Sequence, residues 1–257
     1  MASTHPSPSC ARPLYISAEL FHFFGSAAPL DDERNYDLLK TVLASGCVSH
    51  PPHEVGWGAI GYTLDLSKTL AREDMLVPSV TCYCDIPYEQ LGPHISKNGR
   101  FGISFSRHHL TKVGARPVTY VPCRADDWKG VFTGHTLLKE LKATFQGVHE
   151  QLAALSKNQT LKPHGVGLGS LPTSAIEALQ KAEHTLALRV LAFVKPSEST
   201  LDDSDPNYRY SEREWRKLGN LLFESADVLR VVVGEAFIER AREELPEFRE
   251  RICMAPG

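Results

Sequence analysis

The chain has 257 residues, of which 42% are hydrophobic, and this is enough to build a sizeable core in one large domain or two small ones. Its formal net charge of -3 and pI near 6.4 exclude the strongly basic balance of general nucleic-acid binders and of proteins that bind acidic membrane surfaces. No apolar run approaches the roughly 20 residues that a membrane-spanning helix needs, so we expect no membrane association.

The N-terminus and the cysteines indicate a cytoplasmic protein. Residues 1–13 are rich in Ser and Pro, which predicts a disordered tail, and they lack the basic start and apolar core of a signal peptide. The six cysteines are scattered without a Cys-x-x-Cys pair, as is typical of reduced thiols. We therefore expect a cytoplasmic location and a single domain over residues 14–257.

An apolar, aromatic stretch near the N-terminus predicts the first strand. Residues 19–24 read Glu-Leu-Phe-His-Phe-Phe, and Gly25 ends them. His22 lies in the middle of this strand, so its buried ring nitrogens need hydrogen-bond partners. His22 is therefore either a satisfied core histidine or a functional group. A helix capped by Asp31 or Asp32 follows and runs to about residue 44.

The loop over residues 47–62 contains His50 and His53 on either side of two prolines. Two such histidines can supply metal ligands, but no further Cys or His cluster follows at zinc-finger spacing. We therefore expect no metal site. A long Gly- and Pro-rich loop in a compact domain is typical of a functional or mobile segment.

The middle of the chain combines strands with short helices. The expected strands cover residues 80–84, 99–106 and 117–122, and the expected helices cover residues 88–97 and 108–113. We expect the third of these strands to be a hairpin-like partner of the second.

Side-chain alternation divides the strand at 99–106 into two faces. Phe101, Ile103 and Phe105 lie on one face, and Ser104 and Ser106 lie on the other. The serine face either contacts solvent or lines a ligand-binding cleft.

Helices dominate the next part of the chain, which we describe as a helical insertion over about residues 128–190. One helix is expected from 128 to about 155, and another from Thr173 or Ser174 to about 186. The second helix either continues through residues 187–194 or gives way to a strand, which we favour near the end. The Gly-rich residues 165–170 lack a preceding strand and the Gly-x-Gly-x-x-Gly spacing, so we assign no phosphate loop there.

Two strand-like runs and a helix complete the chain, at residues 221–223, 228–233 and 236–251. Strands therefore gather towards both ends of the sequence, with helices between them. This order without strict alternation predicts an α+β fold rather than a doubly wound sheet.

The most polar candidate site lies in the stretch from Tyr208 to Leu218, which reads Tyr-Arg-Tyr-Ser-Glu-Arg-Glu-Trp-Arg-Lys-Leu. Glu212 and Glu214 are two residues apart, so in extended chain both point to the same face. The pair is either part of a solvated charge run or an acid/base site.

Several motifs occur in the order found in AbiGi-type abortive-infection proteins, which the chain resembles from about residue 14 to 235. The specific parts are Phe101-Gly-Ile-Ser-Phe-Ser-Arg and Ser211-Glu-Arg-Glu-Trp-Arg. The resemblance implies a bacterial protein of phage defence, in a system where one partner is described as an antitoxin. It also implies a cognate toxin or antitoxin, or a phage component, as partner.

A weaker resemblance is to DarT-like ADP-ribosyltransferases, whose split antiparallel sheet grips NAD without a Rossmann fingerprint. These enzymes carry a His, then a Ser or aromatic motif, then a Glu-x-Glu along the chain. By analogy, His22 would hydrogen-bond the adenosine-side ribose of NAD. Either Tyr83 or Ser104 and Ser106 would support the nicotinamide pocket or the catalytic carboxylate, because the middle motif could fall at 82–85 or at 101–106. The chain has no clear Ser-Thr-Ser motif.

The same analogy gives the glutamates catalytic roles. Glu214 would bind the nicotinamide ribose and stabilise the cation that forms as nicotinamide leaves. Glu212 would orient or deprotonate the acceptor, which could be a protein, a nucleic acid or a small molecule. Arg213 and Arg216 would hold the NAD pyrophosphate or pair with the glutamates, and we favour pairing.

Two classes of function follow. The first is an NAD-dependent ADP-ribosyltransferase-like effector, and the second is a non-enzymatic antitoxin or regulatory partner of a defence toxin. A third interpretation, a hydrolase that uses His22 with Cys82 or Cys84, requires a pairing that the sequence alone does not establish.

Overall fold

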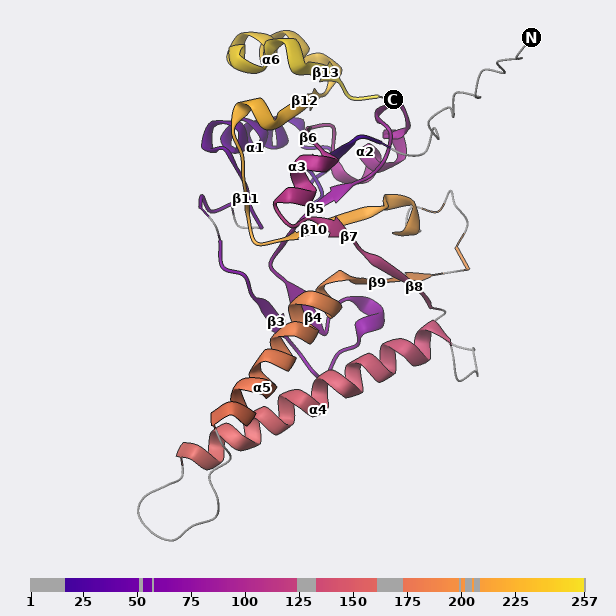
Figure 1. The fold of residues 1–257 in the computed structure, drawn as a ribbon. Helices are drawn as coiled ribbons and strands as arrows, with labels where there is room; N and C mark the ends of the chain where they lie inside the picture. The colour runs from indigo at the N-terminus through magenta and orange to yellow at the C-terminus, as the bar shows by residue number, and fades with distance from the viewer. Residues whose placement is uncertain are drawn as a thin grey trace, which may run out of the picture. The chain divides into compact units, whose positions relative to one another are not determined.

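The fold is described from a computed structural model of the chain (Figure 1). The structure describes residues 17–50, 53–56, 58–123, 133–160, 173–198, 200–201, 205 and 209–256. The predicted tail at 1–13, the start of the predicted helix at 128 and the Gly-rich residues 165–170 lie outside the described residues.

The described chain is α+β, as predicted, and its contacts cluster into two compact units. Unit 1 is drawn from residues 1–41, 84–109 and 225–257, and unit 2 from residues 42–83 and 110–224. The single domain expected over residues 14–257 stays a prediction.

Unit 1 is built on strands from distant parts of the chain, in the order β13-β12-β6-β1. Their bounds are β1 Glu19–Phe23, β6 Gly102–Ser106, β12 Val228–Val233 and β13 Ile252–Met254. β6 pairs antiparallel with β1 and β12, whereas β12 and β13 are parallel, so the sheet is mixed. Its helices are α1 Asp32–Ser45, which runs on into unit 2, α2 Gly92–Asn98, α3 Arg107–Lys112, which crosses between the units, and α6 Ile238–Glu244.

Aromatic packing and one helix cap account for much of unit 1. The rings of Tyr36, Phe101 and Phe237 lie against one another, with the Phe101 and Phe237 centroids 5.0 Å apart. Asp31 Oδ1 accepts the Arg34 N–H at 3.2 Å, so Asp31 is the cap of α1, one of the two residues expected in that role.

Unit 2 holds strands and two helices, α4 and α5. Its strands are β2 Cys47–Val48, β3 Tyr62–Leu64, β4 Leu76–Pro78, β5 Val80–Cys84, β7 Arg116–Pro117, β8 Thr119–Cys123, β9 Val194–Glu198, β10 Glu214–Leu218 and β11 Leu221–Leu222. They pair in the orders β5-β10-β7, β11-β2, β3-β4 and β8-β9. α4 Gly134–Thr160 and α5 Thr173–His184 pack against each other (Figure 1).

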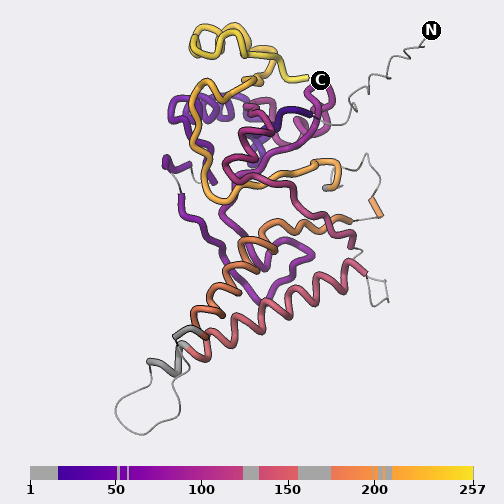
Figure 2. Tube along the Cα trace, viewed as in Figure 1, coloured from indigo at the N-terminus to yellow at the C-terminus, as the bar shows by residue number. Residues whose placement is uncertain are grey.

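One sequence prediction for unit 2 was wrong and another was confirmed. The expected strand at 117–122 does not form a hairpin with 99–106; β8 instead pairs in parallel with β9, seventy-odd residues later. For residues 187–194, the favoured strand near the end is confirmed, because α5 continues as a π-helical turn at Thr185–Val190 and a 3₁₀ turn at Leu191–Phe193, and β9 begins at Val194. The chain enters β9 directly from these turns (Figure 2).

Gly25 sits where two backbone segments of unit 1 lie close together. A Cβ at this position would lie 2.4 Å from the Asn98 carbonyl oxygen and 2.9 Å from the Gly99 Cα, so the backbone would have to move. We expect Gly25→Ala to destabilise unit 1 by about 1–3 kcal/mol. Gly147 lies in α4 with nothing within 4 Å of its added Cβ, so Gly147→Ala should be neutral or stabilising. Hydrogen exchange resolved by peptide measures both, and equal effects would contradict the steric argument.

Candidate functional site

The two glutamates of the polar stretch point to the same place, as the sequence predicted, but not through an extended chain. Glu212 ends a 3₁₀ turn at Arg209–Glu212, and Glu214 begins β10. Arg213 between them has a φ of 45°, a left-handed conformation that is uncommon outside glycine. This sharp change in backbone direction lets both carboxylates reach one cation.

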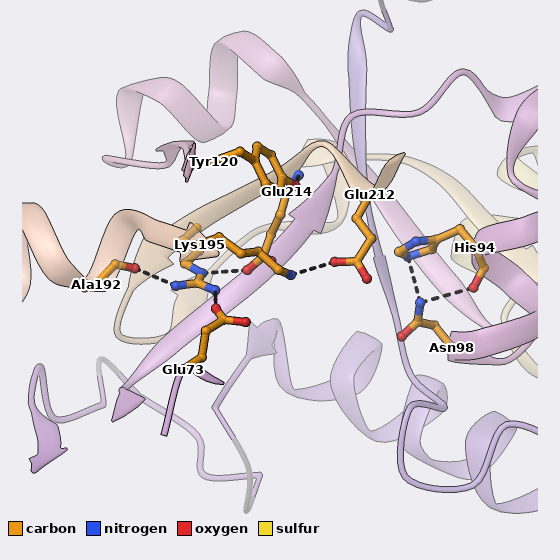
Figure 3. A network of polar contacts seen from close by, with 9 residues as sticks. Glu73, His94, Asn98, Tyr120, Ala192, Lys195, Glu212 and Glu214 are labelled. Carbon is orange, nitrogen blue, oxygen red and sulfur yellow. Dashed lines mark hydrogen bonds and ion pairs between the residues drawn. The ribbon is translucent and has the colours of Figure 1, made fainter. Parts of the chain in front are cut away.

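That cation is the ammonium of Lys195 in β9, which lies between the two glutamates (Figure 3). Its Nζ donates to Glu212 Oε2 at 2.6 Å and also to Glu214 Oε2. The Lys195 and Glu214 side chains are each only 9% exposed, whereas Glu212 is 23% exposed. Glu214 is therefore the buried member of the glutamate pair, and Glu212 lies nearer the solvent.

Arg216 occupies the other oxygen of Glu214. Its Nε donates to Glu214 Oε1 at 2.6 Å, as the predicted arginine–glutamate pairing requires, and its Nη2 donates to Glu73 Oε1 at 2.8 Å. Its Nη1 donates to the Ala192 carbonyl oxygen at 2.8 Å. The planar guanidinium thus binds three acceptors on three separate segments of unit 2.

Tyr120 of β8 completes the set of contacts around Glu214. The Glu214 backbone N–H donates to the hydroxyl oxygen of Tyr120, which lies beside Glu214 (Figure 3), at 2.8 Å. The Tyr120 and Tyr210 rings meet edge to face. We call Glu73, Lys195, Glu212, Glu214 and Arg216 the charge cluster. With Tyr120, it links β8, β9 and β10 to the segments that hold Glu73 and Ala192.

The charge cluster keeps Glu214 ionised. Burial alone would raise the pKa of Glu214, but the positive charges and hydrogen bonds of Arg216 and Lys195 lower it to about 2. Burial works against the Lys195 ammonium too, yet the adjacent Glu214 and Glu212 raise its pKa above the ordinary range. Glu214 is therefore a permanent anion near neutral pH, with no proton to donate.

These contacts limit the chemistry that Glu214 can perform. A general acid or base works best with a pKa near the working pH, and a group with a pKa of about 2 is far from it. A carboxylate that stabilises a cationic transition state must also reach the substrate. Both oxygens of Glu214 already accept hydrogen bonds from cations of the same chain. The geometry fits a structural role for Glu214 best.

The other predicted site residues of unit 2 also have internal contacts. Tyr83 is 2% exposed, and its hydroxyl lies 3.1 Å from the Thr81 hydroxyl. Cys82 is exposed, whereas Cys84, the last residue of β5, is counted in unit 1 and is buried. Arg213 shapes the turn between the glutamates and its backbone N–H donates to the Tyr210 carbonyl oxygen at 3.3 Å.

The remaining predicted residues, His22, Ser104 and Ser106, belong to unit 1. The His22 ring meets the Phe24 ring edge to face at 4.8 Å. Ser104 is fully buried and donates to Glu19 Oε2 at 2.8 Å, so the serine face of β6 does not contact solvent at this position. Ser106 Oγ accepts the His109 backbone N–H at 3.0 Å and caps α3. The roles in NAD binding remain predictions.

Sequence reasoning missed Glu73, Tyr120 and Lys195. Lys195 did carry a signal, because it stands in the apolar run Leu-Ala-Phe-Val-Lys-Pro at 191–196. A lysine in such a run is buried only when a carboxylate pairs with it, so the run predicts an acidic partner without identifying it.

The described residues contain neither a metal-ligand group nor a helix that could cross a membrane. No group of three or more His, Cys, Asp and Glu side chains there has the arrangement of a metal site. Within that same part of the chain, no helix has the length and apolar character needed to cross a membrane.

Comparison with known proteins gives one family. The family model described as "Putative abortive phage resistance protein AbiGi, antitoxin" matches residues 65–250, a range that contains the whole charge cluster. No curated protein and no solved structure matches the chain.

Proposed function

Because the chain belongs to the AbiGi family of abortive phage resistance proteins, we propose that it is an antitoxin that neutralises a cognate toxin by binding it. The observation that carries this proposal is the pairing of Glu214. Its side chain is 9% exposed, and both its oxygens are held by Lys195 and Arg216. The Glu214 carboxylate, the best candidate catalytic group of the chain, therefore stabilises unit 2 through these ion pairs.

The charge cluster suits a binding function because it fixes the positions of distant segments of unit 2. Lys195 and Arg216 connect strands and turns that are far apart in the sequence, and the contacts fix their relative positions. A rigid framework lowers the entropy that a protein loses when it binds a partner. The charge cluster therefore supports a preformed binding surface on unit 2.

The second candidate function is the NAD-dependent ADP-ribosyltransferase activity implied by the weaker resemblance. Its support is the convergence of Glu212 and Glu214 on the Lys195 ammonium, which brings two carboxylates together as that chemistry needs. Glu212, the more exposed of the two, would be the group that meets an acceptor. In this function the toxic activity would reside in the chain itself.

Expression in bacteria separates the two functions. The antitoxin function predicts that the chain alone is harmless, that it restores growth when the protein encoded beside it is toxic, and that the two co-purify. The transferase function predicts that the purified chain consumes NAD, and that Glu212→Gln abolishes this turnover. NAD turnover by the chain alone together with failure to rescue growth would overturn the antitoxin proposal.

A further inference from the structure

Unit 2 has a pocket of about 300 Å³, and no residue of the charge cluster lines it. Residues of β7, β8, α4 and β9 and of the turns before β9 line it. Val194 lines the pocket, and the next residue, Lys195, belongs to the charge cluster. Because successive side chains of a strand point to opposite faces, β9 separates the two sites.

Two arginines, Arg116 and Arg189, give the pocket its positive charge. The Arg116 guanidinium lies 3.7 Å from the centre of the Phe193 ring and donates to the Arg189 carbonyl oxygen at 2.5 Å. Among the described residues, neither arginine forms an ion pair with a carboxylate. Burial and then the nearby Arg189 charge lower the pKa of Arg116, and an anion between the two would relieve the repulsion.

The walls of the pocket are apolar and partly open to solvent. Leu137 is 44% exposed and Val190 is 36% exposed, whereas Val121, which also lines the pocket, is buried. Arginine is enriched at the energetically important positions of protein interfaces, and Arg116 here is stacked on the Phe193 ring. The volume is at the lower end of ligand pockets, which suits a few side chains rather than a large cofactor.

We propose that this pocket binds an acidic, apolar segment of a protein partner, with a carboxylate between Arg116 and Arg189 and an apolar side chain against Leu137 and Val190. A guanidinium pair is the preferred recognition group for a carboxylate. Nucleic acid fits less well, because phosphate binding relies on extended basic surfaces and the chain has a net charge of -3. That the partner is a protein rests on the proposed antitoxin function.

Defined peptides test the pocket without the toxin. The probes are fluorescein-labelled ten-residue peptides in which Leu alternates with Asp, Asn or Lys, and a ten-nucleotide thymidine oligomer. Fluorescence anisotropy should show that the Asp peptide binds at least about tenfold more tightly than the Asn peptide. In Arg189→Glu the pocket keeps one positive and one negative charge, so the Asp peptide should lose its advantage over the Asn and Lys peptides. This variant should fold, because the Arg189 side chain extends from an exposed position.

Matched variants decide whether binding is at the pocket. Arg116→Gln and Leu137→Ser should each weaken binding of the Asp peptide, whereas Arg249→Gln, at an exposed position of unit 1, should not. Equal affinity for the Asp and Asn peptides, no binding of the Asp peptide at 1 mM (about the weakest affinity of interest), or tighter binding of the oligonucleotide would overturn the proposal.

Growth-rescue experiments distinguish a failure of the pocket proposal from a failure of the antitoxin proposal. If the wild-type chain neutralises the toxin and Arg189→Glu does so equally well, the pocket assignment is wrong and the antitoxin function stands. If the wild-type chain does not neutralise the toxin, the antitoxin function is wrong. The peptide-binding measurements still test whether the pocket binds an acidic segment.

Discussion

Glu214→Gln should lower the free energy of unfolding of unit 2 by about 3 kcal/mol, because it removes a buried charge between two buried cations. Lys195 and Arg216 would remain, and among the described residues the lysine would keep its ion pair with Glu212 and the arginine its ion pair with Glu73. Removal of one member of a buried ion pair leaves the desolvation cost of the others in place. Hydrogen exchange of amides in β9 and β10 measures the change within unit 2.

Glu212→Gln is the matched control for this prediction. The substitution is chemically identical and removes a contact to the same Lys195 ammonium, but the Glu212 side chain is 23% exposed. Water screens an ion pair at such a position, so we expect a loss of about 1 kcal/mol or less. Equal losses in the two variants would contradict the structural role of Glu214. Unchanged stability of Glu214→Gln with complete loss of NAD turnover would instead support the transferase function.

Local sequence patterns predicted much of the secondary structure because those elements depend on near neighbours. β1, β5 and β12 carry dense apolar and β-branched residues, and α1 has an aspartate cap at its start. The predicted pairing partner of β8 was wrong because strand pairing depends on the whole fold. The parallel β8-β9 pair joins residues more than seventy positions apart, with two helices between them.

The candidate site shows the same division between local and distant information. The spacing of Glu212, Glu214 and Arg216 was visible in the sequence, and the pairing of Arg216 with Glu214 was confirmed. The turn at Arg213 and the contact of Lys195 in β9 with the glutamates could not be predicted from the sequence, because both depend on tertiary structure. Yet Lys195 turns two candidate catalytic carboxylates into the centre of a buried ion-pair network.

The stability of unit 2 should also depend on pH through Glu214. Its pKa is about 2 in the folded chain, because Arg216 and Lys195 outweigh the effect of burial, against an ordinary value of 4.5. The unfolded chain therefore takes up a proton at Glu214 before the folded chain does. The stabilisation is complete above about pH 4.5 and is lost as the pH falls towards 2.

A difference of this size in pKa corresponds to about 3 kcal/mol, which matches the loss expected for Glu214→Gln because protonation and the mutation remove the same charge. Other carboxylates also titrate in this range, so the test compares the two proteins. The gap in unfolding free energy between wild type and Glu214→Gln should be about 3 kcal/mol at neutral pH and should nearly close by about pH 2. Denaturation with guanidinium chloride at a series of pH values measures this gap, with amide hydrogen exchange in β10 as the readout of unfolding. A gap that stays constant through this range would mean that the charge of Glu214 contributes nothing to the stability of unit 2.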